Sequence, residues 1–164
     1  MKHEGGMDLE QLLTIVAAVR SVGCRYWLEG GWGIDALVGR QTRAHRDVDL
    51  DIDSAFEHHV LTALHGLGYA IETDWRPTRV ELAAPGRGWV DVHPLTLDAQ
   101  GNARQAALAG GWHELPRSFF TMGSIGALAV PCFTAEAQRF FHSGYELRDV
   151  DRDDLAALDR LPSP

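Results

Sequence analysis

One stretch of the chain alternates acidic and apolar residues without interruption from Asp47 to Asp53. A strict period of two predicts a β-strand, because successive side chains of a strand point to opposite faces. One face of this strand then carries three aliphatic side chains, and the other carries four carboxylates spaced about 6.6 Å apart. Such a strand needs a hydrophobic core under its apolar face, and its acidic face must either be exposed to solvent or line a binding site.

Two structural explanations compete with a functional one for the row of carboxylates. Like charges repel and Asp is a poor strand residue, so an acidic edge strand that deters pairing is the first. A calcium-binding EF-hand loop is the second, but its sixth and twelfth positions hold Ile52 and His58 instead of Gly and Glu. The functional explanation is a divalent-cation site in which Asp47 and Asp49 bind Mg²⁺ through hard oxygen ligands.

A third carboxylate is expected from a neighbouring strand. In the segment Trp89–His93 the two valines share one face and Asp91 lies on the other. Asp91 is therefore the predicted third metal ligand or a general base. His93 shares its face, either as a structural histidine or as a substrate contact. Glu81 and Arg79 share a face beside this strand, and they either form a cross-strand ion pair or reach a substrate.

A glycine pair, Gly30-Gly31, follows a predicted strand and precedes a predicted helix, where backbone N–H groups can bind phosphate. The segment Gly31–Ala36 also fits the dinucleotide-binding fingerprint, but the helix is too short for a βαβ crossover, and no Walker sequence occurs. Arg43 and Arg46 follow in a basic loop. They are either solvated or provide cations for a nucleoside triphosphate.

The remaining segments predict one α+β domain over residues 1–164, with a small mixed β-sheet and helices packed on one side. Asp8 is expected to start a helix, and Ser54 with Glu57 to form a capping box. The region 94–131 is the least regular and is expected to be loops with short elements. Other predicted elements are strands at 25–29 and 69–73, a hairpin of 79–84 with 88–93, and helices at 32–38, after Thr134, and at about 151–161.

Composition limits the partners and the compartment. With 164 residues, 45% of them hydrophobic and 23% charged, the chain has ordinary globular values. We expect a cytoplasmic protein without a membrane partner, because no apolar run is long enough to span a bilayer and the N-terminus lacks a signal peptide's apolar stretch. Cys24 and Cys132 are too few for a disulfide scaffold. A net charge of −8 argues against a nucleic-acid partner.

Three segments together resemble the signature of the nucleotidyltransferase superfamily: Leu28–Trp32 with its glycine pair, Asp47–Asp49, and Val90–Val92. Longer stretches are similar to the small lincosamide nucleotidyltransferases, namely Tyr26–Asp35, His45–Asp51, Asp91–Pro94, Pro131–Cys132 and Phe141–Tyr145. Aminoglycoside 2''-nucleotidyltransferases share the Gly-Gly-Trp and Asp-x-Asp portions. The resemblance implies the nucleotidyltransferase fold, related to that of DNA polymerase β, over nearly the whole chain.

The resemblance also implies a reaction. AMP from ATP would pass to a hydroxyl of a lincosamide such as lincomycin or clindamycin, with release of pyrophosphate and antibiotic resistance as the result. An aminoglycoside nucleotidyltransferase is one alternative. A non-catalytic antitoxin or regulatory module is the other, although such a module would be expected to lose some of the three acids. The partners are then a small-molecule antibiotic and a nucleotide, and a homodimer is one assembly that the resemblance allows.

The site residues that follow from the resemblance fall into three groups. The catalytic and metal-binding residues, for a site with two Mg²⁺ ions, are Asp47, Asp49 and Asp91. The nucleotide-binding residues are Gly30, Gly31, Arg43 and Arg46. The candidate antibiotic contacts are Glu81, His93 and Tyr145. For Tyr145 the alternative is a purely structural role.

Overall fold

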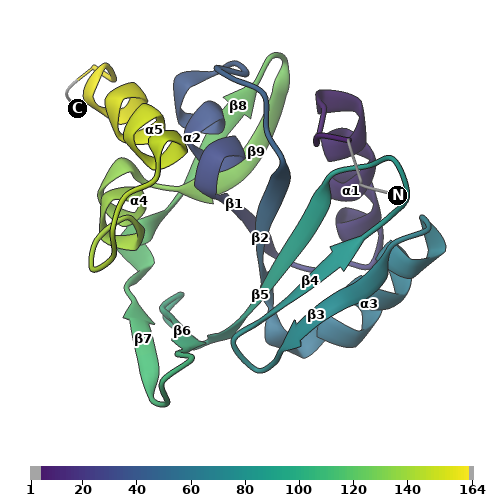
Figure 1. Ribbon diagram of the computed structural model, residues 1–164. Helices are drawn as coiled ribbons and strands as arrows, with labels where there is room; N and C mark the ends of the chain where they lie inside the picture. Colours follow the sequence, from purple (N-terminus) through teal and green to yellow (C-terminus); the bar gives the residue numbers. More distant parts are fainter. Residues whose placement is uncertain (1–4, 163–164) are drawn as a thin grey trace.

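The alternating segment forms a central strand in the computed structural model, which describes residues 5–162 (Figure 1). This strand, β2 (Asp47–Asp53), pairs antiparallel with β1 (Tyr26–Glu29) and parallel with β5 (Trp89–Leu97). The sheet order is β3-β4-β5-β2-β1-β9-β8, with β3 at Ala70–Trp75, β4 at Arg79–Ala83, β8 at Phe120–Ile125 and β9 at Leu128–Phe133. A central position excludes the edge-strand explanation for the carboxylates.

Five α-helices lie within residues 5–162: α1 (Leu9–Ser21), α2 (Gly30–Val38), α3 (Glu57–Gly66), α4 (Ala135–Phe141) and α5 (Asp149–Asp159). A hairpin of β6 (Ala103–Ala106) and β7 (Trp112–Leu115) extends from the end of β5. None of the helices in the described part of the chain is long and apolar enough to cross a membrane. The mixed sheet with its helices agrees with the predicted α+β class.

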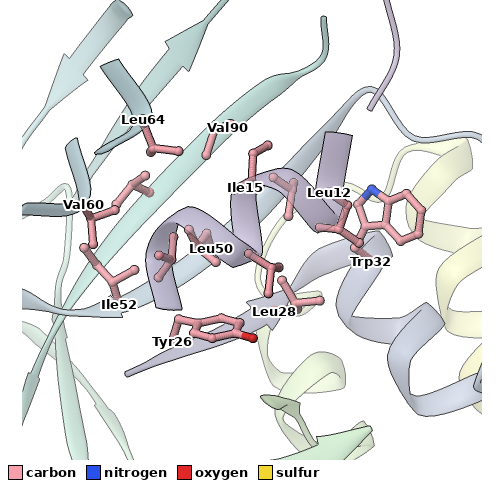
Figure 2. Close-up of a cluster of buried hydrophobic side chains, with 14 of the residues drawn as sticks. Leu12, Ile15, Tyr26, Leu28, Trp32, Leu50, Ile52, Val60, Leu64 and Val90 are labelled. Atoms are coloured by element: carbon pink, nitrogen blue, oxygen red, sulfur yellow. The ribbon is translucent and has the colours of Figure 1, made fainter. Parts of the chain in front are cut away.

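The main apolar core lies under one face of the sheet, where α1, α3 and Trp32 of α2 pack (Figure 2). Leu50 and Ile52 of β2 are fully buried there, beside Leu12 of α1 and Leu64 of α3. Burying a Leu or Ile side chain contributes roughly 1.5–3 kcal/mol, so this face fixes the register of β2. Because side chains alternate along a strand, the carboxylates of β2 must face the other side.

Two smaller clusters hold elements around the acidic face. Phe133 at the end of β9 packs with residues of β7 and α4, including Leu115 and Phe141. Ile34 of α2 packs with Leu158 of α5. In Figure 1 the hairpin β6–β7 and the helices α4 and α5 lie on the left, and α1 and α3, which cover the apolar face, lie on the right. Tyr145 and Arg148, between α4 and α5, line one cavity with the carboxylates.

The region 94–131, expected to be loops with short elements, contains more strand than was expected. β5 continues to Leu97, and the strands β6, β7, β8 and most of β9 fall in this region. β9 pairs with β1 in parallel through Leu28 and Cys132, and β8 pairs with β9. These strands depend on partners distant in the sequence, and their local pattern of residues is weak, with Gly123 in β8 and Pro131 in β9.

Some predicted helix starts also differ. Ser54 and Glu57 form no capping box: residues Ser54–Phe56 are a 3-10 helix, and the Asp53 carboxylate accepts the N–H of Ala55 (3.1 Å). The last helix begins at Asp149, where the backbone N–H of Arg148 donates to the Asp151 carboxylate (2.8 Å). In both places the residue that caps the backbone is an aspartate at the expected start or one residue before it.

The predicted cap of the first helix is confirmed. The Asp8 carboxylate accepts the backbone N–H of Gln11 (2.8 Å) and satisfies one N–H group of the first turn. We expect Asp8→Ala to lower the free energy of unfolding by about 1 kcal/mol, measured by urea denaturation. Glu10→Ala is the matched control, because Glu10 lies in the same turn without capping it, and equal losses in the two variants would contradict the capping role.

Candidate active site

Four carboxylates from four adjacent strands lie in one row across the acidic face of the sheet. Glu81 of β4 is in register with Asp91 of β5, Asp91 with Asp49 of β2, and Asp49 with Glu29 of β1. Asp47 lies two residues before Asp49 on the same face. The predicted acids Asp47, Asp49 and Asp91 are therefore brought together by strand pairing.

Basic side chains are interleaved with these acids. The guanidinium of Arg79 donates to the Asp91 carboxylate on the neighbouring strand. This contact is a cross-strand ion pair, one of the two alternatives predicted for Arg79. Arg46 is bonded to Asp47 (3.0 Å) and lies 3.7 Å from Glu81. Each of these pairs reduces the repulsion between carboxylates that are held close by the sheet.

His93 is the third cation of the site. Its Nε2 atom lies 3.3 Å from Asp49 Oδ1 and 3.8 Å from Asp91 Oδ1. Burial opposes the charged imidazolium, but the hydrogen bond to Asp49 and the nearby acids raise the pKa of His93 to about 9. The same contact outweighs the burial of Asp49 and lowers the pKa of its carboxyl. His93 therefore contacts two predicted metal ligands, and it is not on the lining of either cavity described below.

The donor set suits a divalent cation. Asp49, Asp91 and His93 each offer a ligand atom, and these atoms lie within 4.8 Å of one another. Asp91 Oδ1 is buried and has no hydrogen-bond partner within residues 5–162. A buried carboxylate oxygen without a partner is costly, and a bound cation removes that cost. These three residues therefore fit a divalent metal.

The glycine pair forms the first turn of α2 instead of preceding the helix, which was expected to begin at Trp32. Gly30 has φ +63°, and a Cβ atom there would lie 2.3 Å from Asp49 Oδ2. A Cβ atom on Gly31 would lie 2.6 Å from atoms of Arg43 and His45. Only glycine allows the start of α2 to pass this close to the carboxylates, which leaves its free N–H groups beside the acidic row.

A cavity of about 500 Å³ opens over the carboxylates. Its lining includes Asp47, Asp49, Glu81 and Asp91, the two glycines, and the predicted residues Arg43, Arg46 and Tyr145. The guanidinium of Arg43 also forms two 3.0 Å hydrogen bonds to Asp154 of α5. The cavity therefore contains every predicted nucleotide-binding residue, and α5 fixes the direction of one of them.

Several cavity residues were missed by the sequence reasoning. Glu29 stood beside the predicted Gly30 without a role in the site, and Arg148 carried no signal at all; Arg79 was expected to form an ion pair or reach a substrate. Arg148 lies just before α5, where its side chain bonds to Asp151, and it lines the cavity with the acids. A register of strands could have placed Glu29 beside Asp49, but no local pattern points to Arg148.

A second cavity of about 490 Å³ adjoins the first, and Glu29 and Phe141 line both. Its other walls are mainly apolar and come from the β6–β7 turn and from α4; they include Ala106, Ala107, Leu108, Ala109 and Phe140. Gln105 and His113 add polar groups. The arrangement places an apolar chamber next to an acidic one.

The pKa values predict a pH dependence of metal binding. Burial is the main cause that raises the pKa of both Asp47 and Asp91 to about 6, and the charge of Asp49 adds to it. Below that pH the two carboxyls are protonated, and a cation must displace the protons. We expect the apparent affinity for Mn²⁺ to rise with pH between about 5 and 7, by up to about tenfold per pH unit for each proton displaced, measured by Mn²⁺ titration without nucleotide. A pH-independent affinity over this range would contradict these protonation states.

Converging strand carboxylates beside a glycine turn at a helix start define a nucleotidyltransferase site on this fold. The structure superimposes with a TM-score of 0.90 on the lincomycin-bound crystal structure of the lincosamide antibiotic adenylyltransferase LnuA, at 35% identity over 96% of this chain and 100% of that one. It resembles the solution structure of the resistance factor ANT(2'')-Ia with a TM-score of 0.74, at 19% identity over 93% and 84% of the chains, which supports the fold.

Sequence comparison gives the family. The profile of the aminoglycoside-2''-adenylyltransferase family matches residues 11–158. A lincosamide resistance protein of Staphylococcus haemolyticus is 38% identical over 149 residues, which cover 91% of this chain and 92% of the relative. The chain belongs to the aminoglycoside-2''-adenylyltransferase family and is a nucleotidyltransferase.

Proposed function

We propose that the protein transfers AMP from ATP to a hydroxyl group of a lincosamide antibiotic and thereby confers resistance. The observation that carries the proposal is the pair of adjoining cavities, one lined by carboxylates and arginines and the other by apolar side chains. A triphosphate with its metal needs the first, and a largely apolar acceptor needs the second. The similarity over nearly the whole chain to proteins named for lincosamides supports this acceptor.

In the proposed reaction the acidic row acts on the triphosphate. Asp47, Asp49 and Asp91 would bind two Mg²⁺ ions. When bound, these ions offset the negative charge of the phosphates. N–H groups of Gly30 and Gly31 and the cation of Arg46 would bind the phosphates as well. Arg43, held by Asp154, would add positive charge at the same cavity.

The acceptor hydroxyl would attack the α-phosphorus of ATP. An O–P bond forms, the bond to the β-phosphate breaks, and pyrophosphate leaves. Asp91 would take the hydroxyl proton, since its Oδ1 has no hydrogen-bond partner in the described chain. Glu81 lies next to it and lines the same cavity, where it would orient the hydroxyl, and Tyr145 would form part of the wall. His93 would act by holding Asp49 in place.

A substitution in the β6–β7 turn tests the position of the acceptor. Leu108 is 70% exposed and lines the apolar cavity, so Leu108→Asp places a charge there without disturbing the core. We expect the KM for lincomycin to rise about tenfold with little change in the KM for ATP. Met122→Asp is the control, because Met122 is 59% exposed on β8 and lines neither cavity. An unchanged lincomycin KM in Leu108→Asp would place the acceptor elsewhere.

Mass spectrometry of the drug tests the activity itself. The purified protein is incubated with Mg²⁺ and ATP, together with lincomycin or kanamycin. An AMP adduct on lincomycin alone supports the proposal. An adduct on kanamycin alone supports the aminoglycoside alternative, for which 2''-aminoglycoside nucleotidyltransferases match at 45% identity over 47 residues, 27% of this chain. No adduct on either would overturn both, and parallel reactions with GTP, CTP and UTP test the choice of ATP.

Three further expectations stay predictions. The non-catalytic module would be favoured by the absence of any transfer, although all three acids are present in the site. A homodimer would be tested by light scattering of the eluted protein. The absence of a nucleic-acid partner and the cytoplasmic location follow from composition and sequence alone.

A further inference from the structure

A second group of ligand-type side chains lies beside the catalytic carboxylates. Glu29, Asp51 and His93 each offer one ligand atom, and these atoms lie within 4.8 Å of one another. The three residues come from three adjacent strands: Asp51 of β2 is in register with His93 of β5, and Glu29 ends β1, beside Asp49. We call this group the inner cluster. It shares His93 with the catalytic acids but has its own two carboxylates.

The carboxylate of Asp51 is the unusual member of the inner cluster. It is completely buried, and neither of its oxygens has a hydrogen-bond partner among the residues that the structure describes. Glu29 Oε2 is also buried without a partner in that part of the chain. The next acid along the strand, Asp53, differs, because it bonds to Arg25 and to the N–H of Ala55. Glu29 as a whole is half-buried, and His93 is the basic group beside both Glu29 and Asp51. Two carboxylates this close repel each other unless a further cation or a shared proton joins them.

The third member is oriented from behind. His93 Nδ1 lies 3.1 Å from the side-chain amide of Gln105 on β6, so its Nε2 points toward the carboxylates. The atom nearest Nδ1 is the amide nitrogen of Gln105, which donates, so Nε2 carries a proton in this arrangement. A metal on Nε2 requires the Gln105 amide to turn its oxygen toward Nδ1, which then donates to it and holds the ring.

We propose that Glu29, Asp51 and His93 form an inner binding site for a divalent transition-metal ion, behind the catalytic acids. Two carboxylate oxygens and one imidazole nitrogen suit Mn²⁺, Zn²⁺ or Fe²⁺ better than Mg²⁺, which prefers oxygen ligands alone. The bound ion adds positive charge beside these carboxylates. Its bond to His93 Nε2 takes the place of the contact of that atom with Asp49, so the inner ion and the His93–Asp49 contact exclude each other.

The site is tested by counting bound Mn²⁺ in the full-length protein without nucleotide or antibiotic. Free Mn²⁺ is followed by electron paramagnetic resonance during titration of the chelator-treated protein. We expect Asp51→Asn to bind one Mn²⁺ fewer per chain than the wild type. Asp47→Asn is the matched control, since Asp47 lines the outer cavity and is absent from the inner cluster, and it should retain the Mn²⁺ that Asp51→Asn loses.

A second variant and a direct view complete the test. Gln105→Leu should weaken the inner ion by about 10–100-fold through loss of the support to His93. If Asp51→Asn does not fold, as judged by its thermal melt, Glu29→Gln replaces it with the same expectation. Crystals soaked in Mn²⁺ should show anomalous density between Glu29, Asp51 and His93. Equal Mn²⁺ counts in Asp51→Asn and wild type, or no density there, would overturn the proposal and leave a shared proton between Glu29 and Asp51.

This test is separate from that of the antibiotic reaction. It measures metal binding without ATP or acceptor, so the absence of drug modification would leave its result unchanged. Conversely, an adduct on lincomycin together with equal Mn²⁺ counts would keep the proposed function and remove the inner site.

Discussion

Asp49→Asn is expected to lower kcat for nucleotidyl transfer by about 100-fold or more while the protein still folds. The amide keeps the size of the side chain, and its oxygen can still accept the hydrogen bond of His93. It loses the negative charge that binds a cation in the centre of the acidic row. A 100-fold loss corresponds to about 2.7 kcal/mol in the activation barrier. The measurement is steady-state kinetics with lincomycin, ATP and saturating Mg²⁺, beside a thermal melt.

Asp53→Asn is the matched control for this variant. Asp53 lies on the same face of β2, but its carboxylate bonds to Arg25 and Ala55 and lines neither cavity. Its kcat should stay within about twofold of the wild type, since removing a charge outside the metal site changes little. Asp47→Asn should behave like Asp49→Asn. Full turnover in Asp47→Asn and Asp49→Asn would end the case for a metal held by these acids.

Gly30→Ala is expected to have an effect of similar size by a different route. The new Cβ atom would lie 2.3 Å from Asp49 Oδ2, a distance that real Cβ atoms do not show, so Asp49 or the start of α2 must move. A displacement of about 1 Å at a reacting centre can cost about 100-fold in rate. We therefore expect kcat to fall by about that factor, measured under the same conditions as for Asp49→Asn.

Backbone strain has to be separated from this collision, because Gly30 has φ +63°. Gly126 offers the comparison: its φ is +59°, and a Cβ atom there would meet nothing within 4 Å. Both alanine variants should lose stability, by roughly 1–3 kcal/mol for a residue in a sparsely populated region of φ and ψ. Only Gly30→Ala should lose activity. If Gly126→Ala loses as much, strain and not the contact with Asp49 is the cause.

The features that depend on neighbours in the chain could be predicted from the sequence, and those that depend on distant residues could not. The alternation at Asp47–Asp53 fixed the strand, its buried face and its acidic face, because a period of two follows from local backbone geometry. The cap at Asp8 and the hairpin after Arg79 likewise depend on neighbours in the chain. The strands in the region 94–131 could not be predicted in this way, because they are stabilised by β1 and by one another.

The candidate site shows the same division more sharply. From the sequence came the acids, the glycine pair and, through the alternation in Trp89–His93, the expectation that Asp91 joins Asp49 from a neighbouring strand. Tertiary structure decided that Glu29 and Glu81 extend the row, that Arg148 and α5 close one side, and that Gln105 orients His93. Each of these contacts joins segments far apart in the chain, and it exists only because burial of Leu50 and its neighbours on the opposite face fixes the strand register. Sequence alone thus determined the chemical groups, while packing determined which of them meet.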